Sequence, residues 1–329
     1  MINALAITGP TASGKTSVSI ALAKHLNAEI ICCDSMQIYR EMDIGTAKAT
    51  GKERAETPHY MLDFLSPCED YSAEAYRSAA VQVAAEISLR GALPMFVGGT
   101  GLYIDSVMRA PMNNVPESSK EYRDKLLSEC VGDPCETLWQ RLRLVDPESA
   151  ELIHKNNLRR VIRALEIYDA TGKPKSYFDK LSREKNADIT VGMITLDFHN
   201  RENLYARINE RVDVMMRDGL LAEVDSLYKS GRLPKNSTAA QAIGYKEIIE
   251  YLDGESTLDE AVETIKLSTR RYAKRQLTWF RHEKDAYRLY LDREDGSMKE
   301  TGQIIAEALS AANEFIEGFK LNNYESIRT

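Results

Sequence analysis

The octapeptide at residues 9–16 constrains the fold of this 329-residue chain more than any other segment, and it reads Gly9-Pro10-Thr11-Ala12-Ser13-Gly14-Lys15-Thr16. It matches the phosphate-cradling pattern G-x-x-x-x-G-K-[ST] at every fixed position. The apolar run at residues 4–7 is typical of a buried strand, and residues 17–26 are typical of a helix. In such a strand–loop–helix unit, backbone N–H groups and the positive helix end attract phosphate oxygens. The sequence therefore predicts a phosphate site, with Lys15 as a point charge and the Thr16 hydroxyl as a Mg²⁺ ligand. The alternative is a glycine-rich turn with an exposed lysine.

Apolar strands and helices alternate over the first hundred residues. Residues 29–33 and 93–97 are expected strands, and Ser72 is the expected cap of a helix over residues 71–90. Further strands are expected at 189–198 and 287–291. Strands separated by helices indicate a parallel sheet with helices on both faces. Because ligands lie at the carboxyl ends of such strands, Lys15, Asp34 and Thr100 are expected around one crevice.

The character of the chain changes between Pro111 and Ala187. Prolines at 111, 116, 134, 147 and 174 separate helical patches without a clear strand, which predicts a helical insertion. We therefore expect a discontinuous core of residues 1–115 and 188–329, and an inserted helical domain of residues 116–187. Beyond residue 200 the chain is helical again, and a long helix is expected over 258–282 with an inner apolar stripe.

Composition restricts the class of protein. The formal net charge is −7 and the pI is about 5.5, which disfavours nucleic-acid binding driven by total charge. Two basic segments, at 159–175 and 270–284, nevertheless concentrate positive charge locally. No apolar run reaches about 18 residues and no secretory signal is apparent, so we expect no membrane span and a cytoplasmic location. Cys32 and Cys33 lie in an apolar run and are expected to be buried, and a disulfide framework is not expected.

Asp34 closes the second expected strand and is followed directly by Ser35, Met36 and Gln37. A carboxylate beside a phosphate site holds a metal ion or accepts a proton from a substrate. The alternative for a polar run at a strand end is an ordinary turn.

Several further motifs occur in a fixed order along the chain. They are Asp34-Ser35-Met36-Gln37-Ile38-Tyr39, Asp43-Ile44-Gly45-Thr46-Ala47-Lys48, Gly98-Gly99-Thr100-Gly101-Leu102-Tyr103, Arg160-Val161-Ile162-Arg163-Ala164-Leu165-Glu166, Arg207-Ile208-Asn209-Glu210-Arg211-Val212, Ile243-Gly244-Tyr245 and Lys274-Arg275-Gln276-Leu277-Thr278-Trp279-Phe280. Together with the glycine loop, this set closely resembles the bacterial tRNA dimethylallyltransferases, also called tRNA isopentenyltransferases, over residues 4–285. The resemblance implies an α/β fold of the P-loop NTPase type, a parallel sheet flanked by helices with a helical insertion domain.

The resemblance also implies a reaction. The dimethylallyl group of dimethylallyl diphosphate would move to the exocyclic N6 amine of adenosine 37, next to the anticodon of certain tRNAs. The glycine loop, although of a type associated with ATP and nucleotide binding, would hold the diphosphate leaving group with Mg²⁺, and no ATP need be spent. The expected partners are tRNA, through its anticodon stem-loop, and dimethylallyl diphosphate, and a monomer is expected.

The resemblance assigns roles residue by residue. Asp34 would take the proton of the amine, Arg211 would contact the diphosphate, and Thr100 belongs to the catalytic set. Arg207 and Arg211, four residues apart on one helix face, can point at one target; the alternative is a surface pair bound to acidic residues. The residues expected to contact tRNA are Asp34, Ser35, Met36, Gln37, Thr100, Arg123, Arg159, Arg160, Val161, Ile162, Arg163, Gln241, Ala242, Ile243, Gly244, Tyr245 and Lys246.

Two other classes of protein compete with this interpretation. A small-molecule kinase also combines such a loop with an aspartate after the second strand, but it leaves the two basic segments unexplained. A GTPase-like switch is disfavoured because the guanine-reading pattern N-K-x-D is absent from the sequence.

Overall fold

The computed structural model describes residues 1–110, 119–182 and 186–326, and the chain forms two compact units. Unit 1 combines Met1–Val107 with Asp188–Thr329, and unit 2 is Met108–Ala187. The expected boundary between residues 115 and 116 lies outside the described residues.

Unit 1 is built on one six-stranded parallel sheet with the strand order β3-β2-β4-β1-β5-β6. The strands are β1 Ile2–Thr8, β2 Ala28–Cys32, β3 His59–Tyr60, β4 Leu93–Val97, β5 Ile189–Asp197 and β6 Tyr287–Tyr290. The five strands expected from apolar runs are confirmed. The edge strand β3 was not predicted, because two residues are too few to show a periodic pattern.

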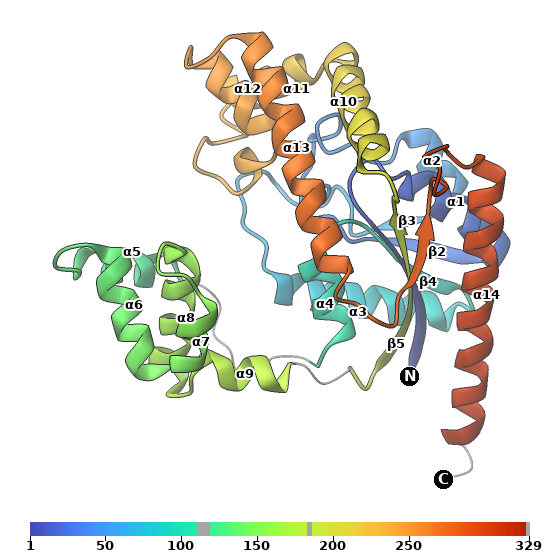
Figure 1. Cartoon of the computed structure of the whole chain (residues 1–329), viewed down its shortest axis with the longest axis horizontal. Helices are drawn as coiled ribbons and strands as arrows, with labels where there is room; N and C mark the ends of the chain where they lie inside the picture. The colour runs from blue at the N-terminus through green and yellow to red at the C-terminus, as the bar shows by residue number, and fades with distance from the viewer. Residues whose placement is uncertain (111–118, 183–185, 327–329) are drawn as a thin grey trace. The chain divides into compact units, whose positions relative to one another are not determined.

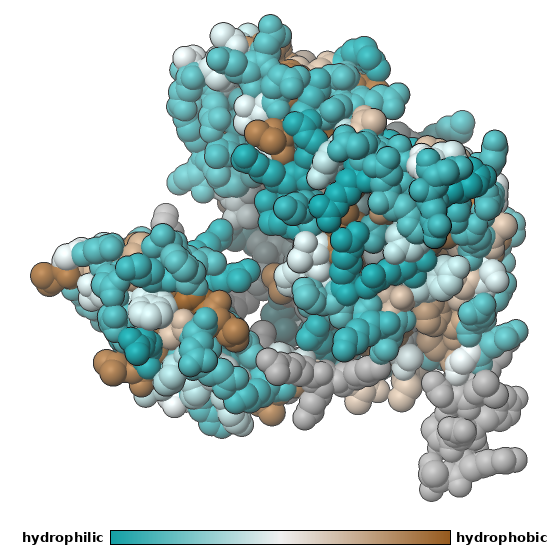
Figure 2. Space-filling view, in the orientation of Figure 1, coloured by the Kyte–Doolittle hydropathy of each residue, from teal (hydrophilic) through white to brown (hydrophobic). Residues whose placement is uncertain are grey.

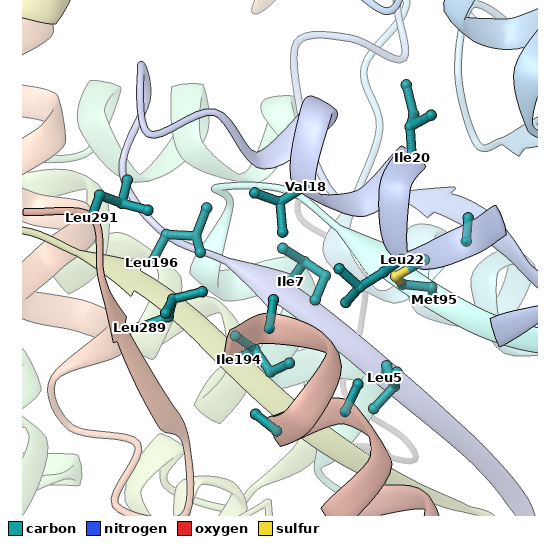
Figure 3. Close-up of a cluster of buried hydrophobic side chains, with 14 of the residues drawn as sticks. Leu5, Ile7, Val18, Ile20, Leu22, Met95, Ile194, Leu196, Leu289 and Leu291 are labelled. Carbon is teal, nitrogen blue, oxygen red and sulfur yellow. The ribbon is translucent and has the colours of Figure 1, made fainter. Parts of the chain in front are cut away.

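Helices cover both faces of this sheet (Figure 1). Helices α1 (Lys15–Leu26) and α14 (Thr301–Ser326) pack on the face that carries Leu5 and Ile7, and α3 (Ala73–Leu89) covers the other face. Figure 3 shows Leu5 and Ile7 of β1 beside Leu22 of α1 and Leu196 of β5, all fully buried. As predicted, Ser72 caps α3, and its hydroxyl accepts a hydrogen bond from the Ala75 N–H at 3.0 Å. Packing of these helices on the sheet fixes the positions of the carboxyl ends of β1, β2 and β4.

A second helical group of unit 1 lies beyond the carboxyl ends of the strands (Figure 1). Its members are α10 Arg201–Asp218, α11 Leu220–Lys229, the short 3₁₀ helix η1 Ala239–Gln241, α12 Tyr245–Leu252 and α13 Leu258–Phe280; the remaining helices of this unit are α2 Gly51–Glu56 and α4 Gly101–Met108. Val212, Leu220 and Ile265 form an apolar cluster with Tyr39 and Met42 from the loop after β2. This cluster fixes the loop after β2 against α10–α13.

Unit 2 is helical throughout its described residues. It contains α5 Lys120–Ser128, α6 Pro134–Val145, α7 Pro147–Leu152, α8 Leu158–Thr171 and α9 Lys175–Leu181. Leu138, Leu142 and Leu165 are buried in its own apolar core. Two of the prolines begin helices, because proline fits the first turn and the preceding aspartates cap α6 and α7.

The molecular surface seen in Figure 2 is mostly hydrophilic, with scattered apolar spots. Val131 and Leu144 are among the exposed large apolar side chains of the described residues. Over residues 1–110, 119–182 and 186–326, no helix combines the length and apolar character needed to cross a bilayer.

Candidate active site

The loop of residues 9–14 joins β1 to α1 as the sequence predicts. Gly14 caps α1 in the left-handed conformation, with φ of 81°, which suits glycine because it has no Cβ. No side chain caps this helix, so the N–H groups of its first turn remain directed at the loop. The Lys15 ammonium donates to the carbonyls of Gly9 at 3.1 Å and Pro10 at 2.8 Å and so lies across the loop. The result is an anion cradle at a helix N-terminus.

Ser13 gives a second indication that this loop is shaped for an oxygen-rich ligand. Its side chain is only 2% exposed, yet its hydroxyl has no hydrogen-bond partner within the described residues. Because buried polar groups are almost always paired, an unpaired hydroxyl inside a glycine loop is consistent with a partner supplied by a ligand.

Three cations gather at the cradle. Arg207 of α10 donates from Nε to the carbonyl of Ala12 at 2.9 Å, and Arg211 lies one turn further along the same helix. Burial, and then the Arg211 charge, lower the pKa of Lys15 to about 8, although Asp34 opposes this shift. Burial and the neighbouring Arg207 also lower the pKa of Arg211, again opposed by Asp34. Arg207 contacts the glycine loop and Arg211 lines the cavity beside it, so the two arginines lie at one site. The positive charge at the loop favours an anionic ligand.

Asp34 lies at the carboxyl end of β2, on the rim of the same site. Its Oδ1 accepts a hydrogen bond from the Met36 N–H at 3.0 Å, which fixes the carboxylate at the start of the loop after β2. Thr100, after β4, accepts from the Ser35 N–H at 3.0 Å, and its own N–H donates to the carbonyl of Cys33 at 3.1 Å. Thr100 therefore holds the loop that carries Asp34.

Two cavities meet at Asp34. The smaller, of about 100 Å³, is lined by Lys15, Thr16 and other residues of the glycine loop. The larger, of about 260 Å³, is lined mostly by apolar residues of α10, α13, the segment 241–244 and the loop after β2. The residues that line both cavities are Thr11, Asp34, Thr46, Arg211 and Tyr272. The arrangement places an anion site beside a carboxylate, and both beside a largely apolar chamber.

The expected segment at 241–246 forms part of the larger chamber. Gln241, Ala242, Ile243 and Gly244 line it. Tyr245 is fully buried and donates its hydroxyl to Glu223, whereas Lys246 is exposed and lies 3.6 Å from the Glu250 carboxylate. The structure thus places Tyr245 behind the wall of the chamber and Lys246 on the surface.

Glu223 of α11 was not singled out from the sequence, yet it organises this wall. Its carboxylate accepts hydrogen bonds from the N–H groups of Asp43 at 3.0 Å, Ile44 at 2.8 Å and Gly45 at 3.1 Å, in addition to Tyr245. The motif at 43–48 is therefore a structural element that presents Thr46 to both cavities.

Two residues of α13 were also missed as site residues. Tyr272, expected only as part of the apolar stripe, lines both cavities, and burial followed by the nearby Asp34 charge raises its pKa, so the phenol stays neutral. Gln276 is 5% exposed and lines the smaller cavity. A polar glutamine on the inner stripe of a helix was the available sequence signal.

The remaining predicted tRNA contacts lie in unit 2. Arg159 and Arg160 are exposed at the start of α8, and Arg163 pairs with Glu166 at 2.7 Å. Val161 and Ile162 are buried in the core of unit 2, at 0% and 4% exposure, so their side chains stabilise the bundle instead of facing solvent. Arg123 is half-buried on α5. The solvent-facing part of the predicted segment is therefore its pair of leading arginines.

A magnesium ion fits the chemistry of the smaller cavity. Within the described residues there is no cluster of three or more His, Cys, Asp or Glu side chains that could form an all-protein metal cage. Mg²⁺ bound with a phosphate ligand needs few protein oxygens, because phosphates and water complete its octahedron. The Thr16 hydroxyl and the Asp34 carboxylate both line this cavity and are donors of the kind Mg²⁺ prefers.

The parallel sheet and the glycine loop define a protein of the P-loop-like α/β class, and the clustered cations favour an anionic ligand at the loop. Comparison with known proteins narrows this class. Residues 37–283 match a family model described as IPP transferase, and residues 2–67 match one described as isopentenyl transferase. A tRNA dimethylallyltransferase of Thermoanaerobacter sp. (strain X514) is 48% identical over 281 residues, covering 85% of this chain and 89% of the relative. One from Bacillus cereus (strain AH187) is 47% identical over 302 residues, covering 91% and 92%.

Solved structures agree with the sequence comparison. The full-length tRNA isopentenylpyrophosphate transferase of Bacillus halodurans superposes with a TM-score of 0.71 at 40% identity, covering 98% of this chain and all of that one. A eukaryotic dimethylallyltransferase described as acting on tRNA gives a TM-score of 0.80 at 28% identity, covering 97% of this chain and 80% of that one. The chain belongs to the IPP transferase family, the family of the tRNA dimethylallyltransferases.

Proposed function

We propose that this chain transfers the dimethylallyl group of dimethylallyl diphosphate to the N6 amine of adenosine 37, beside the anticodon of tRNA. The observation that carries the proposal is the meeting of two cavities at Asp34, one an anion cradle and the other a largely apolar chamber. Membership of the IPP transferase family supports this reaction, and the two adjoining cavities support the positions that we propose for its participants.

The leaving group occupies the smaller cavity in this proposal. Lys15, Arg211 and the N–H groups of the glycine loop stabilise the charge that grows on the diphosphate as the carbon–oxygen bond breaks. The Thr16 hydroxyl would hold Mg²⁺ here, and the ion would supply further neutralisation of the diphosphate charge. The depressed pKa of Lys15 is consistent with a cation pre-organised for an anion.

The nucleophile approaches from the larger chamber. The N6 lone pair forms the new carbon–nitrogen bond, the carbon–oxygen pair leaves with the diphosphate, and the N6 proton passes to the Asp34 carboxylate. An aromatic amine is a weak nucleophile, so a positioned proton acceptor has a large effect. Thr100, which binds Ser35, contributes by holding the backbone next to Asp34.

The adenine leaves its stack to enter this chamber, at a cost of a few kcal/mol that is smallest in a single-stranded loop. Ser35, Met36 and the segment 241–244 line the chamber and contact the base, and Gln37 lines the neighbouring cradle. Arg123, Arg159, Arg160 and Arg163 of unit 2 and Lys246 of unit 1 contact the tRNA backbone, which makes affinity salt-dependent. The buried members of the predicted set, Tyr245, Val161 and Ile162, support these contacts from behind.

The enzyme is proposed to work as a monomer in the cytoplasm, where its tRNA substrate is available. Size-exclusion chromatography with light scattering tests the first statement, and cell fractionation with an antibody tests the second.

Transfer of label in the absence of ATP tests the reaction. Purified protein is mixed with unmodified tRNA, Mg²⁺ and dimethylallyl diphosphate labelled in the prenyl group. Label is expected in tRNA, and digestion is expected to recover it on a single adenosine. Absence of label in tRNA, with ATP-dependent phosphorylation of a small molecule instead, would establish a kinase.

A further inference from the structure

The side chain of Gln276 connects α13 to two loops of the anion cradle. Its Oε1 accepts a hydrogen bond from the Thr11 N–H at 2.8 Å, and its Nε2 donates to the carbonyl of Gly99 at 2.8 Å. The side chain is 5% exposed, so both bonds are formed away from bulk water. Both ends of one amide are thus committed to backbone groups, one in the loop after β1 and one in the loop after β4.

The bond to Thr11 fixes the middle of the glycine loop. The next residue, Ala12, is held through its carbonyl by Arg207 of α10 at 2.9 Å. Ala12 itself has a left-handed φ of 62°, a conformation that non-glycine residues rarely adopt without support. Side chains from two helices therefore hold the backbone of two neighbouring residues of the loop, and the direction of the following N–H groups depends on both.

The partner of Gln276 in the second loop leaves room for no side chain. A Cβ added at Gly99 would lie 2.2 Å from Gln276 Nε2. Gly99 is not in the left-handed region, so a side chain here would conflict with the position of this amide and not with the backbone conformation of Gly99. The contact between α13 and the loop after β4 thus depends on both the amide of Gln276 and the absence of a side chain at Gly99.

We propose that Gln276 is a positioning residue that sets the shape of the diphosphate cradle by holding Thr11 and Gly99 together. It acts through the loop backbone. Tyr272, one turn earlier on α13, lines the larger chamber, so this helix connects the chamber wall to the cradle. The inference rests on the proposed function for the identity of the substrate, but the main quantity in its test is the binding of inorganic diphosphate.

The first test measures inorganic diphosphate binding to Gln276→Met by calorimetry in the presence of Mg²⁺. Methionine preserves the length of the side chain and removes both hydrogen bonds. The dissociation constant for diphosphate is expected to rise about tenfold, given typical net values for hydrogen bonds. The KM for dimethylallyl diphosphate is expected to rise similarly, while the affinity for tRNA changes less than twofold. Gln82→Met, at an exposed glutamine of α3, is the matched control and is expected to leave both constants unchanged.

The second test reaches the same contact from the other side and remains valid if Gln276→Met is unstable. Gly99→Ala is expected to displace the amide and to weaken diphosphate binding about tenfold. In the Gln276→Ala background the same change meets no amide, so the double variant is expected to bind diphosphate no more weakly than Gln276→Ala alone.

The outcomes separate the inference from the proposed function. Unchanged diphosphate binding in folded Gln276→Met or Gly99→Ala, fully additive losses, or an equal loss of tRNA affinity would overturn the positioning role. If diphosphate binding depends on Gln276 as expected but the wild-type protein transfers no prenyl group, the proposed function would be overturned instead.

Discussion

The larger chamber of unit 1 and the leading turn of α8 in unit 2 are both predicted to contact tRNA, but they are built differently. The chamber wall is fixed by polar contacts, with Glu223 holding three backbone N–H groups and Thr100 holding Ser35. On α8, Val161 and Ile162 pack into an apolar core while Arg159 and Arg160 are exposed. A network of hydrogen bonds fixes the positions of its atoms closely. An apolar core orients a helix but leaves the long, exposed arginine side chains on it mobile. The fixed chamber wall therefore suits the positioning of reacting groups, and the exposed arginines of α8 suit electrostatic binding of the tRNA backbone.

Substitutions in the two regions should therefore separate turnover from tRNA affinity. The largest effect is expected for Asp34→Ala, which removes the proton acceptor at the junction of the cavities. Prenyl transfer should fall by roughly two to four orders of magnitude, the usual range for a positioned acid or base, while tRNA binding is largely retained. Single-turnover kinetics and filter binding measure the two quantities. Asp259→Ala, at an exposed carboxylate of α13, is the control, and wild-type turnover in Asp34→Ala would remove this residue from the mechanism.

A smaller effect is expected for Glu223→Gln, which tests whether the chamber wall depends on its polar network. The neutral amide weakens several charge-assisted hydrogen bonds to residues 43–45, so kcat/KM should fall about ten- to a hundredfold and the unfolding free energy by about 2 kcal/mol. Thermal unfolding and steady-state kinetics provide the measurements. Glu300→Gln, at an exposed carboxylate, should change neither, and a fully active Glu223→Gln would show that the network is dispensable.

The pH dependence of the cradle should be weaker still. The pKa of Lys15 is lowered to about 8, chiefly by burial, so the ammonium loses its proton as pH rises through that value. Because only the charged form attracts the anion, diphosphate affinity and kcat/KM for the diphosphate substrate should be full below about pH 7, about half near pH 8 and about tenfold lower near pH 9. Calorimetry across this range, with Lys15→Arg as the variant whose charge persists, checks the assignment. A flat profile in the wild type between pH 7 and 9.5 would contradict it.

The smallest effect is expected on α8. Replacing Arg159 and Arg160 together by methionine should lower tRNA affinity several-fold at physiological salt and reduce the salt slope by about one for each phosphate that these cations neutralise. The kcat at saturating tRNA should not change, because these side chains lie outside the chamber wall. Arg201→Met, at an exposed arginine of α10, controls for total charge. A loss of kcat in the α8 variant would abolish the contrast between the two regions.

Local signals in the sequence predicted much of this structure. Apolar runs located five strands, a serine located the cap of α3, and the glycine loop located the cradle. On α13, the expected stripe is confirmed by the burial of Ala261, Ile265 and Leu277. These features depend on neighbours within a few residues, which sequence periodicity records directly.

The supporting residues were missed because their partners are distant in the chain. Glu223 binds Gly45 across 178 residues, and Gln276 binds Thr11 across 265. Periodicity in the sequence cannot predict a hydrogen bond between such distant residues. A polar residue on a buried stripe nevertheless indicates that its side chain has a partner. Val161 and Ile162 show a related limit of prediction from motifs. They belong to the same sequence motif as Arg160 and Arg163, but their side chains are buried in the core of unit 2.

The central claim is that the glycine cradle holds a diphosphate expelled from carbon. Dimethylallyl diphosphate carrying ¹⁸O in the oxygen that bridges C1 and phosphorus tests this directly. After transfer to tRNA, mass spectrometry of the released diphosphate is predicted to find all of the ¹⁸O there, because the carbon–oxygen bond breaks. Recovery of ¹⁸O in dimethylallyl alcohol, with phosphate passed to an acceptor, would show cleavage at phosphorus and contradict the account.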